Sequence, residues 1–420
     1  MRHTHKFYTF FFTLLLCAGT SAWADGLPVQ NIDQAYDRVL RNNPTLKAQG
    51  LRIEGLKALI NQANLIPNPE LSVESENFSG SRSGWDEAEN TFALSQKIEL
   101  GGKRSARTSL AKSQATLFEA AAQLRIANLV RDVQIAYSKV VLSQKLFNLA
   151  DEQEQFAKTV VRTATDKVAH GGILAGEKTK AEIALRVISI DKQKSENRLD
   201  QSKRALASFW NGTANDVAEI TDLLGDDLTT KLSLPPVDET LALKARSSQV
   251  TVSQQAVRNE RAQVIPDITF TGGYRRFEET DDDAFVAGIS VPLPFFNRNR
   301  GRITQAIKEV EANKAEYVRS ETSVKAQLDN LMQTRKVLQM ERATILKHLL
   351  PDSEQALTDI RKAYRFGRVG YLDLIDSQEV YFGAKEREAQ NLFELRSNEA
   401  TIKAITGQIL QTIEEAKSHE

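Results

Sequence analysis

The chain has 420 residues, and its 55 Lys and Arg side chains balance 55 Asp and Glu, so its formal net charge is zero. Without a basic excess the chain has no general attraction for nucleic acid, and we expect no nucleic-acid partner. Only 21 glycines and 10 prolines occur. So few helix breakers, among many Ala, Leu, Gln, Glu, Lys and Arg residues, favour long helices.

The N-terminus has the three parts of a secretory signal peptide. Arg2 and Lys6 give a positive start, an apolar run follows, and Ala22 and Ala24 frame a small-x-small cleavage site. The apolar run is short for a membrane span. We therefore expect residues 1–24 to be removed by cleavage after Ala24, and the mature chain to leave the cytoplasm.

The single cysteine of the chain, Cys17, lies inside this signal peptide. A lipid-modified cysteine normally follows a small residue, whereas Leu16 precedes Cys17. Lipidation is therefore the less favoured alternative. Once the signal peptide is removed the mature chain has no cysteine, which excludes disulfides and thiolate metal ligands.

Landmarks of the chain occur twice at a nearly constant separation, which indicates an internal repeat. The pairs are Pro67 and Pro266, Ser95 and Ser290, Gly171 and Gly367, and Gly212 and Gly407, which lie 199, 195, 196 and 195 residues apart. We interpret the chain as a tandem duplication. Its predicted parts are a first repeat at 25–212, a linker at 213–240, a second repeat at 241–407 and a C-terminal tail at 408–420.

Each repeat is predicted to contain a helix, two strands, a very long helix, a glycine break and a further helix. Residues 103–170 and 302–350 contain neither Gly nor Pro. Pro351 is expected to break or kink the second long helix before a further glycine-free run to Phe366. A helix of about 65 residues would be about 100 Å long. It therefore needs partner helices along its length, as in coiled coils.

Four runs of sequence alternate between apolar and polar positions, as half-buried strands do. They cover residues 70–78, 91–100, 267–276 and 284–294. Each run has about the ten residues of a tilted membrane-spanning strand. A small antiparallel sheet packed on a helix is the alternative interpretation.

Four strands are too few to close a membrane barrel, because about eight are the practical minimum. An open sheet edge is not viable in lipid, since its backbone groups would have no hydrogen-bond partners. If these strands span a bilayer, several chains must share one barrel. Three chains would supply twelve strands.

The duplication, the strand pairs, the long helices and a glycine-plus-acid motif in each repeat resemble the TolC-like outer-membrane efflux proteins of Gram-negative bacteria. Residues 94–104, LSQKIELGGKR, and 291–301, VPLPFFNRNRG, are similar to the heavy-metal branch of that family, the cobalt–zinc–cadmium resistance outer-membrane factors. The resemblance implies a mainly α fold with a β-barrel portion. Long helices would form a coiled-coil barrel, and four transmembrane strands per chain would join a twelve-stranded barrel shared by a homotrimer.

The resemblance also implies a location, partners and a function. The strands would lie in outer-membrane lipid and the helices in the periplasm, docked to a periplasmic adaptor (a membrane fusion protein) and an inner-membrane resistance-nodulation-division pump. The implied function is a duct that exports divalent heavy-metal cations. Multidrug efflux or type I secretion is the alternative with the same fold. A soluble periplasmic coiled-coil adaptor, with its strands in a small packed domain, is the alternative of another class.

The sequence shows no set of residues that would form an enzyme site or a metal centre. The mature chain has His170, His348 and His419, none of them in a recognisable motif, and no phosphate loop or nucleotide fingerprint. Met332 and Met340 are more typical of a helix core than of a metal site. We therefore predict no enzyme, no cofactor and no metal site. A conduit must bind its ions weakly enough to release them.

An acidic residue follows the glycine break by six positions in both repeats: Glu177 follows Gly171, and Asp373 follows Gly367. Helix capping explains most such motifs, because acids favour the positive end of a new helix. However, Asp373 and Asp376 share one helix face. In a trimer each acid would become a ring of three carboxylates that attracts cations.

The resemblance implies that these turns form the periplasmic gate. Tyr364 matches the gate tyrosine of the family, and Asp373, Asp376 and Glu177 would form the cation-selective rings. The family prototype has an arginine two positions after the glycine, where this chain has Val369. Two alternatives follow: Arg365 or Arg368 substitutes for that arginine in the latch, or the closed state is weaker. The helix turns at Gly171, Gly172, Gly367 and Gly370 would be where the adaptor docks.

Overall fold

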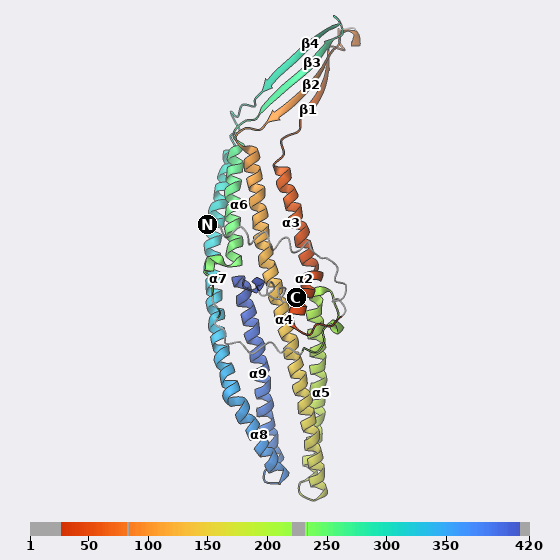
Figure 1. Cartoon of the computed structure of the whole chain (residues 1–420), viewed down its shortest axis with the longest axis vertical. Helices are drawn as coiled ribbons and strands as arrows, with labels where there is room; N and C mark the ends of the chain where they lie inside the picture. The colour runs from red at the N-terminus through yellow and green to blue at the C-terminus, as the bar shows by residue number, and fades with distance from the viewer. Residues whose placement is uncertain (1–26, 82–83, 221–231, 233, 412–420) are drawn as a thin grey trace. The chain divides into compact units, whose positions relative to one another are not determined.

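The computed structural model describes residues 27–81, 84–220, 232 and 234–411 (Figure 1). The predicted signal peptide, its cleavage site after Ala24 and Cys17 lie outside these residues. Contacts divide the chain into two compact units. The helical unit is Met1–Gly50, Gln123–Leu241 and Ser323–Glu420, and the sheet unit is Leu51–Ala122 and Ala242–Thr322. Each unit takes segments from both predicted repeats, whose boundaries stay a prediction.

The sheet unit contains all four predicted strands, in one antiparallel sheet. They are β1 (Glu70–Glu76), β2 (Glu89–Ile98), β3 (Ile268–Phe277) and β4 (Asp282–Ser290), and they lie side by side in the order β1-β2-β3-β4 (Figure 1). The short 3₁₀ helix η1 (Gly84–Glu87) lies in the β1–β2 connection. The fourth strand ends at Ser290 rather than at 294, because Pro292 and Pro294 have no N–H to donate to a ladder.

The two faces of this sheet differ in character. Val73, Phe92, Tyr274 and Phe285 lie opposite one another across the four strands and therefore share a face. Other members of this exposed apolar face are Leu71, Leu94, Phe270 and Ile289. The opposite face carries mostly polar residues, including Glu70, Glu74, Thr91, Ser95, Thr271 and Arg275. The outer edges of β1 and β4 pair with no strand in the part of the chain that the structure describes.

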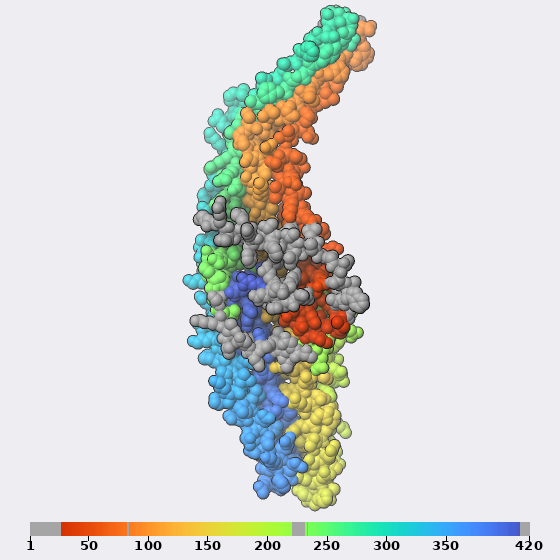
Figure 2. All heavy atoms as spheres, in the orientation of Figure 1, coloured from red at the N-terminus to blue at the C-terminus, as the bar shows by residue number. Residues whose placement is uncertain are grey.

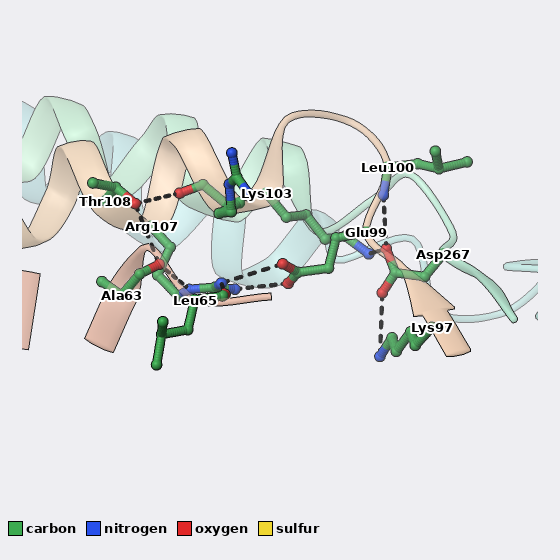
Figure 3. A network of polar contacts seen from close by, with 10 residues as sticks. Ala63, Leu65, Lys97, Glu99, Leu100, Lys103, Arg107, Thr108 and Asp267 are labelled. Carbon is green, nitrogen blue, oxygen red and sulfur yellow. Dashed lines mark hydrogen bonds and ion pairs between the residues drawn. The ribbon is translucent and has the colours of Figure 1, made fainter. Parts of the chain in front are cut away.

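A network of polar contacts joins the strands to the helices within the sheet unit (Figure 3). Arg107 makes a two-pronged contact with Glu99, at 2.7 and 3.2 Å. The same guanidinium donates to the backbone oxygens of Ala63 and Leu65, at 2.8 and 2.9 Å. These carbonyls lie at the end of α3 (Pro44–Ala63), where a helix leaves its last oxygens without partners. Arg107 therefore links the C-terminal end of α3 to Glu99, the residue that directly follows β2.

Asp267 is the second centre of this network. Its carboxylate accepts from Lys103 Nζ at 2.6 Å and from the Leu100 amide at 3.2 Å, and it pairs with Lys97 Nζ at 3.2 Å. Burial alone would raise the pKa of Asp267, but the hydrogen bonds from Lys103, Leu100 and Lys97 lower this pKa by more. The ion pair is itself buried, with Lys103 and Asp267 side chains 7% and 11% exposed.

Gly101 begins the turn between β2 and the long helix at a φ of +68°. A Cβ at this position would lie 2.7 Å from the Cβ of Ile265. Both the positive φ and the close approach therefore require glycine here. This turn places Lys103, the first residue of the long helix, and Arg107, one helix turn further on, beside the strand ends.

The helical unit is built around the long predicted helix, and the structure confirms it as α4 (Lys103–Ala169), which has 67 residues and contributes to both units. Further helices are α2 (Ile32–Asn42), α5 (Ala175–Ala207), α6 (Leu241–Ala262), α7 (Arg300–Thr344), α8 (Leu350–Arg365) and α9 (Tyr371–Thr406). Short 3₁₀ helices are η2 (Ser208–Trp210), η3 (Ala214–Asp216) and η4 (Val237–Glu239). No helix in the described ranges is long and apolar enough to cross a membrane.

Pro351 neither breaks the second long helix nor leaves it regular. A five-residue π-helical turn, η5 (Ile345–Leu349), joins α7 to α8, and Pro351 lies in the first turn of α8. A proline inside an α-helix lacks the N–H for the i to i−4 bond, and its ring collides with the preceding turn. The wider π turn accommodates both effects and lets the helical path continue.

The antiparallel pairing of α7 with α9 is set by two buried asparagines. Asn391 donates to the backbone oxygen of Leu338, and Asn398 donates to that of Leu331, both at 3.1 Å. The donors are seven residues apart on α9 and the acceptors seven apart on α7, in opposite directions. A buried amide that finds its partner in only one register fixes that register.

Replacing Asp267 by Asn should test how strongly the polar network joins strands to helices. Lys103 would then be a buried charge without its carboxylate, and the free energy of unfolding should fall by about 3 kcal/mol. Chemical unfolding in detergent measures the change. Lys97→Met is the matched control and should cost little, because the Lys97 side chain is 53% exposed. A loss equal to the control's would show that the buried pair does not hold the junction.

Candidate functional site

The two predicted glycine breaks form the same hydrogen-bonded helix end. After α4, the Gly171 amide donates to Val168 O at 3.0 Å and the Gly172 amide to Lys167 O at 2.8 Å. After α8, the amides of Gly367 and Arg368 donate to Tyr364 O and Ala363 O at 3.0 and 2.9 Å. Gly171 and Gly367 have φ values of +72° and +70°. This is the Schellman end, in which a left-handed glycine lets the chain satisfy the last carbonyls and turn back.

The helices that follow these turns begin with the predicted acids. Asp373 accepts from the Gly370 amide at 2.9 Å in the first turn of α9. Glu177 occupies the first turn of α5. Asp373 and Asp376 are exposed, and Glu177 is half-buried. The structure therefore gives Asp373 a capping role and leaves its charge facing solvent, so capping and a cation-attracting ring are compatible.

A buried cluster connects the two helix hairpins, α4–α5 and α8–α9, near their turns. The ends of the two hairpins lie side by side at the bottom of Figure 2. We call it the tip cluster; its buried members are Val160, Ala164, Ala181, Leu357, Tyr364, Tyr371 and Leu374. Val369 packs against it. This packing gives a physical reason for valine at the position where the family prototype has arginine, because a guanidinium there would have to be desolvated against apolar side chains.

Tyr364 is a member of the tip cluster rather than a surface residue, and its exposed fraction is 2%. Its hydroxyl is buried and has no hydrogen-bond partner among the described residues. Burial raises the pKa of Tyr364, and the negative charge of Glu177 raises this pKa further. The structure thus brings together two residues that the sequence placed at the same gate.

Lys167 is the contact of Tyr364 that sequence reasoning missed. Its Nζ lies 4.1 Å from the centroid of the Tyr364 ring and donates to the Tyr364 backbone oxygen. The lysine is in the last turn of α4 and the tyrosine in the last turn of α8, so this pair joins the two hairpins. The only signal in the sequence was the position of Lys167 one helix turn before Gly171.

The two arginines expected to complete the latch lie elsewhere. Arg365 and Arg368 are exposed, and the Arg368 guanidinium lies 5.8 Å from the centroid of the Phe366 ring. Within the described ranges neither arginine makes a hydrogen bond to Tyr364. Their part in a latch stays a prediction, whereas Lys167 already contacts the tyrosine.

A groove runs beside the tip cluster between α4, α5 and α9. Its volume is about 420 Å³, and small residues such as Ala157, Ala184 and Gly383 line it together with Val187 and Ile375. Small side chains allow a further helix to approach closely. Among the described side chains, no group of three or more His, Cys, Asp or Glu residues could hold a metal ion.

Comparisons with known proteins agree over most of the chain. The family model described as "Outer membrane efflux protein" matches residues 35–212 and 238–408. The cobalt-zinc-cadmium resistance protein CzcC of Cupriavidus metallidurans is 27% identical over 386 residues, which is 90% of each chain. The nickel-cobalt-cadmium resistance protein NccC of Alcaligenes xylosoxydans xylosoxydans is 24% identical over 314 residues, 72% of this chain and 69% of its own.

A solved structure shares the fold at low sequence identity. The crystal structure of the outer membrane protein VceC from Vibrio cholerae matches with a TM-score of 0.74 at 18% identity, over 90% of this chain and 96% of that one. Agreement over nearly the full length of both chains shows that the strands and long helices described above are arranged as in that protein's fold.

Replacing Lys167 by Met should loosen the contact between the two hairpins. A cation over an aromatic ring contributes about 1 to 2 kcal/mol, so amides in the last turn of α8 should exchange hydrogen about 5- to 30-fold faster. Hydrogen-exchange mass spectrometry measures this rate. Arg365→Met removes a neighbouring positive charge as a control and should leave exchange unchanged. Equal rates in the wild-type protein and in Lys167→Met would contradict a stabilising Lys167–Tyr364 contact.

Proposed function

The chain belongs to the outer membrane efflux protein family, whose model matches most of both its halves, and we propose that it is the outer-membrane duct of a tripartite efflux system that exports divalent heavy-metal cations. The cargo is inferred from relatives named for resistance to cobalt, zinc, cadmium and nickel. The family and the branch expected from the sequence are confirmed by these matches. Members of the family are channels, and we propose no catalytic role.

The observation that carries this proposal is the sheet, which has one exposed apolar face and two outer edges with no strand partner among the described residues. The exposed apolar face suits contact with lipid, and the polar face opposite suits a water-filled lumen. The edges of β1 and β4 need strand partners in a bilayer. Three copies would supply them in a closed barrel of twelve strands. A soluble adaptor, by contrast, would leave the apolar face in water.

The turns after α4 and α8 are proposed as the periplasmic gate. In a homotrimer, Asp373, Asp376 and Glu177 from three chains would surround one opening. Asp373 and Asp376 are exposed, which keeps their charges available to passing ions. The tip cluster and the Lys167–Tyr364 contact would hold the two hairpins of each chain together when the gate is closed.

We further propose that the periplasmic adaptor docks at the same tips, and that it links the duct to an inner-membrane resistance-nodulation-division pump. The turns at Gly171, Gly172, Gly367 and Gly370 end the hairpins. The groove beside the tip cluster, lined by small side chains, would accept a helix of the adaptor. Selection among metals would lie in the pump, since a duct that bound its ions tightly would not release them.

Removing the gene from its host should lower the tolerance of the cells to cobalt, zinc or cadmium, because the export route would lose its outer part. A plasmid copy of the wild-type gene should restore tolerance. Growth inhibition measured metal by metal, with a panel of drugs alongside, tests this. Unchanged metal tolerance together with new drug sensitivity would favour the multidrug alternative over metal export.

Replacing Asp373 and Asp376 together by Asn should lower the preference for cations over anions by a factor on the order of ten, because the focusing charge is removed. Asn at 373 keeps an oxygen that can accept from the Gly370 amide, so the variant separates charge from capping. Reversal potentials in planar bilayers measure the preference. If selectivity is unchanged, the pair serves as a helix start only.

A further inference from the structure

The segment between β4 and α7 exposes large apolar side chains next to basic ones. Beyond Ser290 the alternation of the apolar face carries on through Val291 and Leu293, which are 40% and 67% exposed. Phe295 and Phe296 follow, at 67% and 102%. We call residues 291–302 the anchor segment. It follows the last residue of β4 and leads into the start of α7 (Figure 1).

The charge of the anchor segment has a single sign. Arg298, Arg300 and Arg302 are exposed, and residues 291–302 contain no acid. Within the described part of the chain, none of these three guanidiniums makes a hydrogen bond or an ion pair. Arg204 and Arg319, by contrast, each pair with a nearby carboxylate, at 2.7 and 2.8 Å. The anchor segment therefore presents three solvent-exposed cations, without a protein partner among the described residues, beside apolar surface.

The segment is held in a defined shape. Asn299 has a φ of +55°, and its amide nitrogen donates to the backbone oxygen and to the carboxylate of Glu260, at 2.9 and 2.8 Å. The Asn299 backbone N–H donates to the side chain of Asn297 at 3.1 Å. Residues 295–302 line an open surface hollow of about 540 Å³. A preformed loop binds a ligand without the entropic cost of ordering it.

We propose that the anchor segment binds the phosphate headgroups of anionic phospholipids in the periplasmic leaflet of the outer membrane. Aromatic rings favour the boundary between headgroups and acyl chains. Guanidinium groups match phosphate oxygens with two parallel hydrogen bonds. The segment continues the apolar face of the sheet, so its phenylalanines and the lipid-facing strands meet the same leaflet. This inference rests on the proposed membrane barrel and adds a preference for lipid charge.

The absence of cysteine from the mature sequence permits a direct test. The full mature chain carrying Phe296→Cys is labelled with bimane and placed in phosphatidylcholine vesicles. These vesicles contain a small fraction of nitroxide-labelled phosphatidylglycerol or nitroxide-labelled phosphatidylcholine. A nitroxide quenches bimane only at close range, so the ratio of the two quenching efficiencies reports which lipid surrounds residue 296.

The anionic lipid should quench roughly fivefold more effectively than the neutral one, since basic side chains concentrate anionic lipid at a membrane surface. Arg298→Gln, Arg300→Gln and Arg302→Gln together should abolish this preference and leave the quenching by neutral lipid. A matched triple variant, Arg186→Gln, Arg204→Gln and Arg319→Gln, removes equal charge from the helices and should keep the preference. Each of the three anchor substitutions made singly should reduce the preference for anionic lipid. The single variants keep the test valid if the triple variant fails to fold.

Equal quenching by both lipids in the arginine-intact protein would overturn the proposal, as would a preference that survives the anchor triple variant. A second label at Ile289→Cys, on the apolar face of β4, separates this failure from failure of the barrel. If the label at 289 is quenched and the label at 296 is not, the anchor segment lies away from lipid although the barrel stands. If neither label is quenched, the membrane barrel fails as well.

Discussion

The structure depends on one constraint, which is that backbone N–H and C=O groups must be paired wherever water is absent. The four described strands satisfy this rule with one another, but no described strand pairs with the outer edges of β1 and β4. The exposed apolar face of the sheet, with Val73, Phe92 and Phe285, suits lipid. The chain therefore has an exposed apolar sheet face that suits the proposed membrane barrel, and two edges that its described strands leave unpaired. In the proposed trimer, other copies of the chain would supply the missing strand partners.

The same dependence on partners governs the helices. A 67-residue helix has far more apolar surface than it can bury by itself, and it is stabilised by packing along its length. Within one chain the tip cluster and the pairing of α7 with α9 provide part of this packing. Two turns of identical hydrogen bonding, at Gly171 and Gly367, reverse the chain and bring acids to the start of the next helices. The acids Glu177 and Asp373 therefore lie near the hairpin turns because each occupies the first turn of a new helix.

Features that depend on local chemistry could be predicted from the sequence. The alternation in residues 267–276 predicts β3, the lack of glycine and proline in 103–170 predicts α4, and Gly171 and Gly367 mark the two turns. Contacts between distant segments could not be predicted in this way. Lys167 meets Tyr364 across 197 residues, and nothing in either local pattern indicates the partner. The π turn before Pro351 likewise depends on how that helix packs, which periodicity does not report.

In the proposed trimer, copies of the chain complete one another's sheet. Native mass spectrometry of the protein extracted from the outer membrane in mild detergent tests it most directly, because it counts the chains in the folded particle. The account predicts three chains in each particle, which dissociate only when the sheet unfolds. A single folded chain, with its strand content intact and no larger species present, would contradict the account.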